Sequence, residues 1–202
     1  MFIQVIQGRV REPAGLRRRI DDWNRDLAPG AEGWLGTTAG VTQDGEFVAV
    51  VRFDSEEAAR RNSDRPEQGR WWEETARLFD GAAAFRDYAS AETFLGGGSD
   101  EAGFVQVMQG RSNDIDRMVA AERELSGLLR EHRPDLIGGT VGWTRAGEFT
   151  ETAYFTSEAE AREGERRLEQ GPSDLQAAFQ EWMGMVEEIE YLDLADPWLF
   201  SR

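Results

Sequence analysis

The sequence predicts an α+β protein built from two copies of one module, because segments of its first half reappear at a constant distance in its second half. The stretch FIQVIQGR at Phe2–Arg9 returns as FVQVMQGR at Phe104–Arg111, 102 positions later. With the same shift and no gap, the glycines and threonines of Gly36–Thr42 align with those of Gly138–Thr144. The order of strand and helix patterns is also the same in both copies, and this order defines the fold class.

The module boundaries follow from the repeat and from one stretch of small residues. The segment GGGSDEAG at Gly96–Gly103 is rich in glycine and reads as a flexible linker. We therefore expect module 1 over residues 1–95, the linker over 96–103 and module 2 over 104–202.

Each copy has the strand and helix order β-α-β-β-α-β, which is the ferredoxin-like arrangement. In copy one the strand over 2–8 precedes a helix whose apolar residues recur at helical spacing, at Leu16, Ile20, Trp23 and Leu27. Strands near 34–42 and 47–53 meet across Asp44-Gly45, a hairpin signal. The next helix starts at Ser55, is broken between Pro66 and Gly69, and gives way to a shorter helix over 71–79. The last strand lies near 84–90, with 186–192 as its counterpart in copy two.

The third strand predicts that both faces of each sheet are covered. Phe47–Val51 (FVAVV) is apolar at every position, whereas a sheet covered by helices on one side only should alternate apolar and polar residues. A second, similar module can supply the missing cover. We therefore expect the two modules to pack sheet to sheet as an intramolecular α+β barrel.

Composition excludes several classes of function. The chain of 202 residues has no cysteine, which excludes disulfides, thiolate nucleophiles and iron–sulfur clusters. Its formal charge of −16 disfavours nucleic-acid binding. No apolar run is long enough for a membrane span, so we expect a cytoplasmic protein without membrane contact. All 23 basic residues are arginine, which favours a bacterial source with a GC-rich genome.

Two motifs of copy one carry a family resemblance. The third strand runs into the helix start FDSEEA at Phe53–Ala58, and the segment NSDRPEQGRWW follows at Asn62–Trp72. Together with the paired modules, these motifs resemble the dimeric α+β barrel superfamily, and more narrowly its antibiotic-biosynthesis-monooxygenase-like domains, here in tandem duplication. In that superfamily two separate chains usually pair. The resemblance therefore implies a monomeric pseudo-dimer or a homodimer of duplicated chains.

The resemblance implies small-molecule chemistry and leaves the reaction open. Similar proteins include cofactor-independent quinone-forming monooxygenases, haem-degrading enzymes and lactone isomerases. The haem enzymes among them carry a histidine ligand, but the single histidine here, His132, lies at the end of a predicted helix. We therefore expect no haem, no other cofactor and no metal site.

Trp71 and Trp72 are the first candidates for ligand binding. They open the short helix of copy one, where their rings could stack on a planar aromatic ligand or fill the core. The aligned residues of copy two are Ser173 and Asp174, so a site lined by tryptophan would exist only once.

Polar residues on the strands are the second set of candidates. Gln7 and Gln109 occupy strand positions where apolar residues are expected, and buried amides need partners. Arg52 and Tyr154 are aligned on the third strand, on the face that would point into the barrel. An arginine there could anchor a substrate, or its side chain could reach the rim.

These observations lead to one interpretation and two alternatives. We interpret the protein as a small-molecule-binding α+β barrel that takes a planar aromatic or apolar compound without a tightly bound cofactor. The first alternative is a cofactor-independent monooxygenase or isomerase of the antibiotic-biosynthesis-monooxygenase type. The second is a structural or stress-related domain with no ligand. The sequence leaves open whether the protein is an enzyme and which module holds the working pocket.

Overall fold

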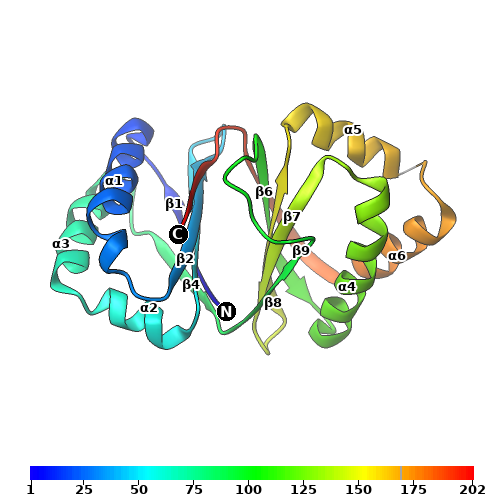
Figure 1. The fold of residues 1–202 in the computed structure, drawn as a ribbon, viewed down its shortest axis with the longest axis horizontal. Helices are drawn as coiled ribbons and strands as arrows, with labels where there is room; N and C mark the ends of the chain where they lie inside the picture. Colours follow the sequence, from blue (N-terminus) through cyan, green and yellow to red (C-terminus); the bar gives the residue numbers. More distant parts are fainter. Residues whose placement is uncertain (169) are drawn as a thin grey trace. The chain divides into compact units, whose positions relative to one another are not determined.

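The computed structural model describes residues 1–168 and 170–202, and these residues form two compact units (Figure 1). Unit 1 comprises Met1–Ser90 together with the C-terminal segment Asp196–Arg202. Unit 2 comprises Ala91–Ala195. No helix in the described part of the chain has the length and hydropathy that a membrane-spanning segment requires.

Unit 1 is a five-stranded antiparallel sheet in the order β10-β2-β3-β1-β4. Its helices lie on one face of this sheet (Figure 1). Two short 3-10 turns, Ala28–Gly30 and Ala76–Leu78, follow the first and third helices. The elements are β1 (Phe2–Arg9), α1 (Pro13–Asp26), β2 (Trp34–Val41), β3 (Glu46–Phe53), α2 (Glu56–Ser63), α3 (Pro66–Thr75), β4 (Ala84–Tyr88) and β10 (Trp198–Ser201).

Unit 2 repeats this architecture with the strand order β5-β7-β8-β6-β9. Its helices also lie on one face of its sheet (Figure 1). The elements are β5 (Ser90–Phe94), β6 (Phe104–Ser112), α4 (Ile115–His132), β7 (Leu136–Trp143), β8 (Glu148–Phe155), α5 (Glu158–Leu168), α6 (Ser173–Met183) and β9 (Val186–Leu194). The predicted pair of tandem ferredoxin-like modules of α+β class is confirmed.

Local sequence signals explain where the elements of unit 1 begin and turn. The hydroxyl of Ser55 caps α2 by accepting a hydrogen bond from the backbone N–H of Ala58 at 3.2 Å. Gly45 closes the hairpin between β2 and β3 with a φ of +91°, a conformation that favours glycine. The short helix was predicted to open at Trp71, which is wrong: α3 begins at Pro66, because proline is well tolerated in the first turn of a helix.

The structure adds one edge strand to each four-stranded module. Residues Ser90–Phe94, which the sequence assigns to the end of module 1, form β5 at the edge of the unit 2 sheet. The C-terminal residues Trp198–Ser201 form β10 at the edge of the unit 1 sheet. Neither strand was predicted from the sequence.

The inner strands carry buried side chains on both faces. Toward the helices, Phe47 and Ala49 of β3 join the hydrophobic core with Leu16 and Ile20 of α1. Alternate residues on the opposite face are buried as well, with Val5 of β1 only 1% exposed. This burial agrees with the apolar character of the strands. The predicted packing of sheet against sheet stays a prediction.

Candidate functional site

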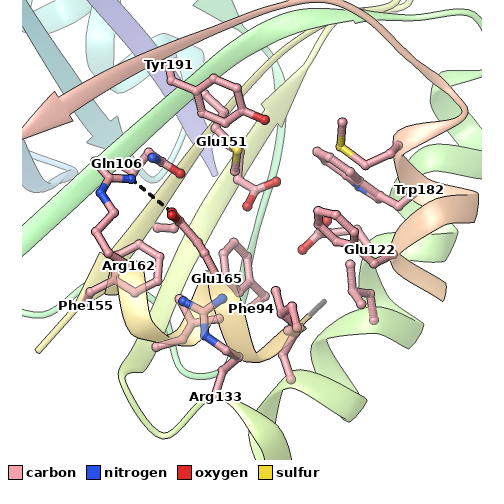
Figure 2. A pocket seen from close by; sticks show the side chains of 18 of the residues that line it. Phe94, Gln106, Glu122, Arg133, Glu151, Phe155, Arg162, Glu165, Trp182 and Tyr191 are labelled. Carbon is pink, nitrogen blue, oxygen red and sulfur yellow. Dashed lines mark hydrogen bonds and ion pairs between the residues drawn. The ribbon is translucent and has the colours of Figure 1, made fainter. Parts of the chain in front are cut away.

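The candidate site is a cavity of about 490 Å³ in unit 2, between the helices and the sheet (Figure 2). Its floor comes from β6, β8 and β9, and its walls come from α4, α5 and α6. The walls are mainly apolar, with Phe94, Leu125, Leu129, Phe155, Leu168 and Trp182 among the lining residues. Phe179 and Tyr191 also line the cavity and are 38% and 48% exposed, so the cavity opens to solvent beside them.

Two carboxyl groups point into this apolar space, those of Glu122 and Glu151 (Figure 2). Glu122 lies on the inward face of α4, since Met118 one turn before it and Leu125 one turn after it are both buried. Glu151 lies on β8 opposite Met108 of β6, on the sheet face that the helices cover. The two glutamates are only 4% and 6% exposed.

Burial changes the protonation of both glutamates. Removal from water raises the pKa of Glu122 to about 7; the hydroxyl of Ser126 opposes this shift, and the charge of Glu92 adds to it. Burial, followed by the charge of Glu122, raises the pKa of Glu151 well above its usual range. Burial therefore favours the protonated form of both carboxyls.

Neither glutamate has a basic partner in the part of the chain that the structure describes. Two arginines line the cavity, and both are engaged by other carboxyls. Arg133 pairs with Asp135 at 2.7 Å, and both side chains are buried. Arg162 contacts the carboxyls of Asp193 and Glu165, the second at 3.0 Å (Figure 2).

Two polar atoms of the cavity walls are buried without a hydrogen-bond partner among the described residues. One is Oε2 of Glu151, an acceptor when the group is ionised. The other is Nε1 of Trp182, which can only donate. Buried polar groups are normally paired, so these two atoms indicate a place where a ligand could supply partners.

A set of metal ligands is not assembled here. In the described residues, no three or more His, Asp or Glu side chains are grouped so that they could hold a metal ion. Glu122 and Glu151 therefore act as a pair of carboxyls in an apolar environment. Such a pair can exchange protons or bind a positively charged group.

The corresponding space in unit 1 is nearly filled. Its cavity measures about 70 Å³ and is lined by Trp23, Trp71 and Trp72 among others. The indole N–H of Trp71 donates a hydrogen bond to the backbone oxygen of Arg19, with nitrogen and oxygen 2.9 Å apart. The rings of Trp72 and Phe85 pack edge to face with their centroids 5.0 Å apart. The predicted role of the two tryptophans in ligand binding stays a prediction.

The other four predicted site residues do not line the cavity of their own unit. Residues alternate between the two faces of a strand, and Gln106 and Glu151 of unit 2 point toward the helices. The side chains of Gln109 and Tyr154 in unit 2, and of Gln7 and Arg52 in unit 1, consequently lie on the opposite faces of their sheets. Tyr154 is 1% exposed, and Gln7 accepts a hydrogen bond from Arg86 at 3.0 Å. Within unit 1, Gln7 and Arg52 thus lie on the sheet face opposite to the one that Trp71 and Trp72 cover.

The sequence analysis did not select Glu122 and Glu151, although a signal was present. The shift of 102 positions aligns them with Ile20 and Ala49 of copy one, both of which are core residues. A glutamate at a position where its repeat partner is apolar and buried is exceptional. Comparing the two copies at core positions would have found both.

Comparison with known proteins gives the fold of the whole chain. No family model and no curated protein matches the sequence. A "putative monooxygenase" from Lactobacillus acidophilus NCFM has a TM-score of 0.78 at 11% identity, over 99% of this chain and 95% of that one. A second, from Fusobacterium nucleatum, has a TM-score of 0.77 at 8% identity, over 100% and 94%. An "anthrone oxidase-like protein" has a TM-score of 0.68 at 13% identity, over 98% and 92%.

The chain has the fold of these monooxygenase-type proteins along its whole length. The expected resemblance to tandem antibiotic-biosynthesis-monooxygenase-like domains is thereby confirmed for the fold. With identities of 8–13%, the likeness does not extend to substrate or reaction.

Proposed function

We propose that unit 2 binds an apolar small molecule, aromatic and planar in shape, in the cavity between its helices and its sheet. The observation that carries this proposal is the cavity itself, about 490 Å³ of mainly apolar space with two buried and unpartnered polar atoms in its walls. Volumes of this size are typical of sites for drug-sized ligands. The aromatic side chains of Phe94, Phe155 and Trp182 offer flat surfaces for stacking. No tightly bound cofactor is needed for binding of this kind.

The test uses a neutral fluorescent probe, N-phenyl-1-naphthylamine, whose emission rises in apolar surroundings. We expect saturable binding of one probe per chain. Leu125→Trp should weaken binding at least tenfold, because it places a ring in the cavity at the position where unit 1 carries Trp23. Thermal unfolding establishes that this variant is folded.

Trp72→Ala provides the matched control, since Trp72 lies in the small cavity of unit 1. It should leave probe binding within about threefold of the parent protein, as expected for a site that it does not touch. Loss of binding in Trp72→Ala, together with unchanged binding in Leu125→Trp, would assign the site to unit 1 and overturn the proposal. Absence of binding by the parent protein would favour the structural alternative, a domain with no ligand.

A cofactor-independent oxygenase is the second candidate function. Two observations favour it: the fold shared with proteins named as monooxygenases, and a buried Glu122 whose pKa of about 7 suits a general base. Such a base would remove a proton from a methylene group whose carbanion is stabilised by conjugation with a carbonyl, and the carbanion would react with O2. The methylene group then becomes a second carbonyl, and one water molecule is released.

Anthrone is a suitable compound for testing this candidate, because the name of one structural neighbour contains it. Its oxidation to anthraquinone consumes one O2 and forms one water per molecule. If the candidate is right, O2 uptake exceeds the protein-free rate and falls about 10²–10⁴-fold in Glu122→Gln, the usual contribution of a general base. O2 uptake equal to the protein-free rate would exclude anthrone oxidation and leave ligand binding as the function.

A further inference from the structure

The charges that line the cavity of unit 2 are unbalanced. Four acidic residues line it, Glu122, Glu151, Glu165 and Asp193, against two basic ones, Arg133 and Arg162. Arg133 is neutralised by Asp135, which lies 2.7 Å away. The guanidinium of Arg162 forms ion pairs with three carboxyls, those of Asp193, Glu165 and Glu158. The nitrogen–oxygen distance is 3.0 Å to Glu165 and 3.6 Å to Glu158. The carboxyls of Glu122 and Glu151 therefore remain without a positive counterpart among the residues that the structure describes.

The fold itself does not require these two carboxyls. In unit 1 the same positions are occupied by Ile20 and Ala49, which belong to the hydrophobic core. Burying a carboxyl in apolar surroundings destabilises a protein unless the group is neutralised or paired. Two such groups lie in one cavity, and one of them has a buried oxygen without a hydrogen-bond partner in residues 1–168 and 170–202. This arrangement indicates that the missing partner comes from a ligand.

The aromatic walls suit the same kind of partner. The faces of Trp182, Tyr191, Phe94 and Phe155 line the cavity around the two carboxyls (Figure 2). The negative potential over an aromatic face attracts cations, and tryptophan and tyrosine do so most strongly. A formal charge of −16 on the whole chain also raises the local concentration of cationic ligands.

We infer that the ligand of unit 2 is an apolar amine, whose ammonium group binds between Glu122 and Glu151 while its hydrocarbon part contacts the aromatic walls. This inference rests on the proposed function, because it names the chemical class of the ligand in the same cavity. The ammonium group supplies hydrogen-bond donors to the carboxylate oxygens, including the unpartnered Oε2 of Glu151.

Amine binding should be linked to pH. Glu122 titrates near pH 7 in the empty cavity, and an ammonium group binds best when the carboxyl beside it is ionised. Amine binding should therefore release protons and tighten as the pH rises. The other titratable or charged groups around the pair are Glu92 on β5, Arg133 after α4, Arg162 and Glu165 on α5, and Tyr191 and Asp193 on β9.

A neutral carbonyl ligand would behave in the opposite way. A protonated carboxyl can donate a hydrogen bond to a carbonyl oxygen, and a ligand held in this way retains the proton. Its affinity would fall as the pH rises through 7. The direction of the pH dependence therefore separates the two classes of ligand.

The experiment compares 1-naphthylmethylamine with the neutral 1-naphthalenemethanol by titration calorimetry at pH 6 and pH 8. We expect the amine to bind at least tenfold more tightly than the alcohol at pH 8. Its affinity should rise about tenfold between the two pH values, because the ionised fraction of a group with a pKa near 7 rises by that factor. Buffers of different ionisation enthalpy should reveal the released protons.

Substitutions assign the effect to the two carboxyls. Glu122→Gln and Glu151→Gln should each weaken amine binding at least tenfold and leave alcohol binding within about threefold, since each removes a charge and keeps the shape. Glu124→Gln, on the exposed side of the same helix α4, is the matched control and should change neither. The comparison of amine with alcohol in the parent protein remains decisive if a variant does not fold.

The outcomes for this inference differ from those for the proposed function. If the alcohol binds as tightly as the amine, or the Gln variants leave amine affinity unchanged, the amine inference is wrong. Binding of N-phenyl-1-naphthylamine would in that case still support the apolar cavity as a site. If the naphthyl compounds and the neutral probe all fail to bind, the proposed function falls together with the inference.

Discussion

Glu122 and Glu151 each contribute a destabilising term to the folded state of unit 2 that depends on pH. Both carboxyls are buried among apolar side chains, and the pKa of Glu122 rises from 4.5 to about 7. A carboxyl whose pKa is higher in the folded state keeps its proton at pH values where the unfolded chain has lost it. Unfolding then releases a proton, so the free energy of unfolding falls as the pH rises from about 4.5 to about 7.

Glu122→Gln should therefore weaken the pH dependence of stability. We expect the free energy of unfolding of the parent protein to fall between pH 5 and pH 8. In the variant this decrease should be smaller by about 1–3 kcal/mol. Urea unfolding at the two pH values measures the difference. Glu124→Gln, which removes an exposed carboxyl from the same helix, should follow the parent profile. Parallel profiles for parent and Glu122→Gln would show that Glu122 ionises normally.

None of the six residues that the sequence patterns singled out lines the cavity of unit 2. The two tryptophans of α3 stand out in the sequence because of their size, but the pattern cannot show whether large rings line a space or fill it. In the structure Trp71 packs against Trp23 with ring centroids 6.4 Å apart, and only about 70 Å³ is left beside them. The glutamates were detectable only by comparison between copies, because each has polar neighbours in the sequence, Arg123 and Glu124 after Glu122, and Thr150 and Thr152 on either side of Glu151.

At the scale of elements, a short strand at a sheet edge contributes buried side chains to the core. β10 has four residues, and its pairing with β2 places Trp198 opposite Ala39. Trp198 is 5% exposed, its ring lies 6.0 Å from that of Phe47, and the guanidinium of Arg17 lies over it at 5.2 Å. The C-terminal segment is thus an integral part of the unit 1 core.

Trp198→Ala should destabilise unit 1 by about 3–5 kcal/mol, the usual effect of removing a large buried aromatic side chain. Hydrogen exchange should also become faster in β2, because its edge is then less well covered. Denaturant unfolding and exchange mass spectrometry measure the two effects. Arg202→Ala, one residue beyond the strand and exposed, should change stability by less than about 0.5 kcal/mol. A Trp198→Ala protein of unchanged stability would mean that β10 does not pack onto unit 1.

The elements that the sequence predicted are those with a local signal. The helix α1 has apolar residues at helical spacing, and the hairpin between β2 and β3 has its Asp44-Gly45 turn. β5 and β10 lack such a signal, because strands of only five and four residues are too short to show a periodic pattern and acquire their conformation from the edge they pair with. This is why the module order was predictable and the two edge strands were not.

At the scale of the whole molecule, duplication has allowed the two copies to diverge. Both units keep the same strand order and the same helix arrangement on one sheet face, yet their cavities measure about 70 and about 490 Å³. Unit 1 fills the space with Trp23, Trp34 and Trp71, whereas unit 2 carries Leu125, Leu136 and Ser173 at the aligned positions. A filled core is the more stable arrangement, and an open cavity is the one that can bind.

Exchanging two residues between the copies tests this division. The double variant Glu122→Ile/Glu151→Ala gives unit 2 the residues of unit 1 at both positions. It should be more stable than the parent protein at pH 8, should lose its preference for 1-naphthylmethylamine over 1-naphthalenemethanol, and should still bind N-phenyl-1-naphthylamine. Urea unfolding and titration with the three compounds provide the measurements.

The reciprocal variant Ile20→Glu/Ala49→Glu places the carboxyls in unit 1, where a cavity of about 70 Å³ is too small for a drug-sized ligand beside them. It should lower the free energy of unfolding by several kcal/mol at pH 8, less so at pH 5, and create no amine site. The same pair of side chains would then be tolerated in one copy and destabilising in the other, because only unit 2 has the space in which a ligand can neutralise them. Equal effects in the two copies would show that the carboxyls do not depend on the cavity.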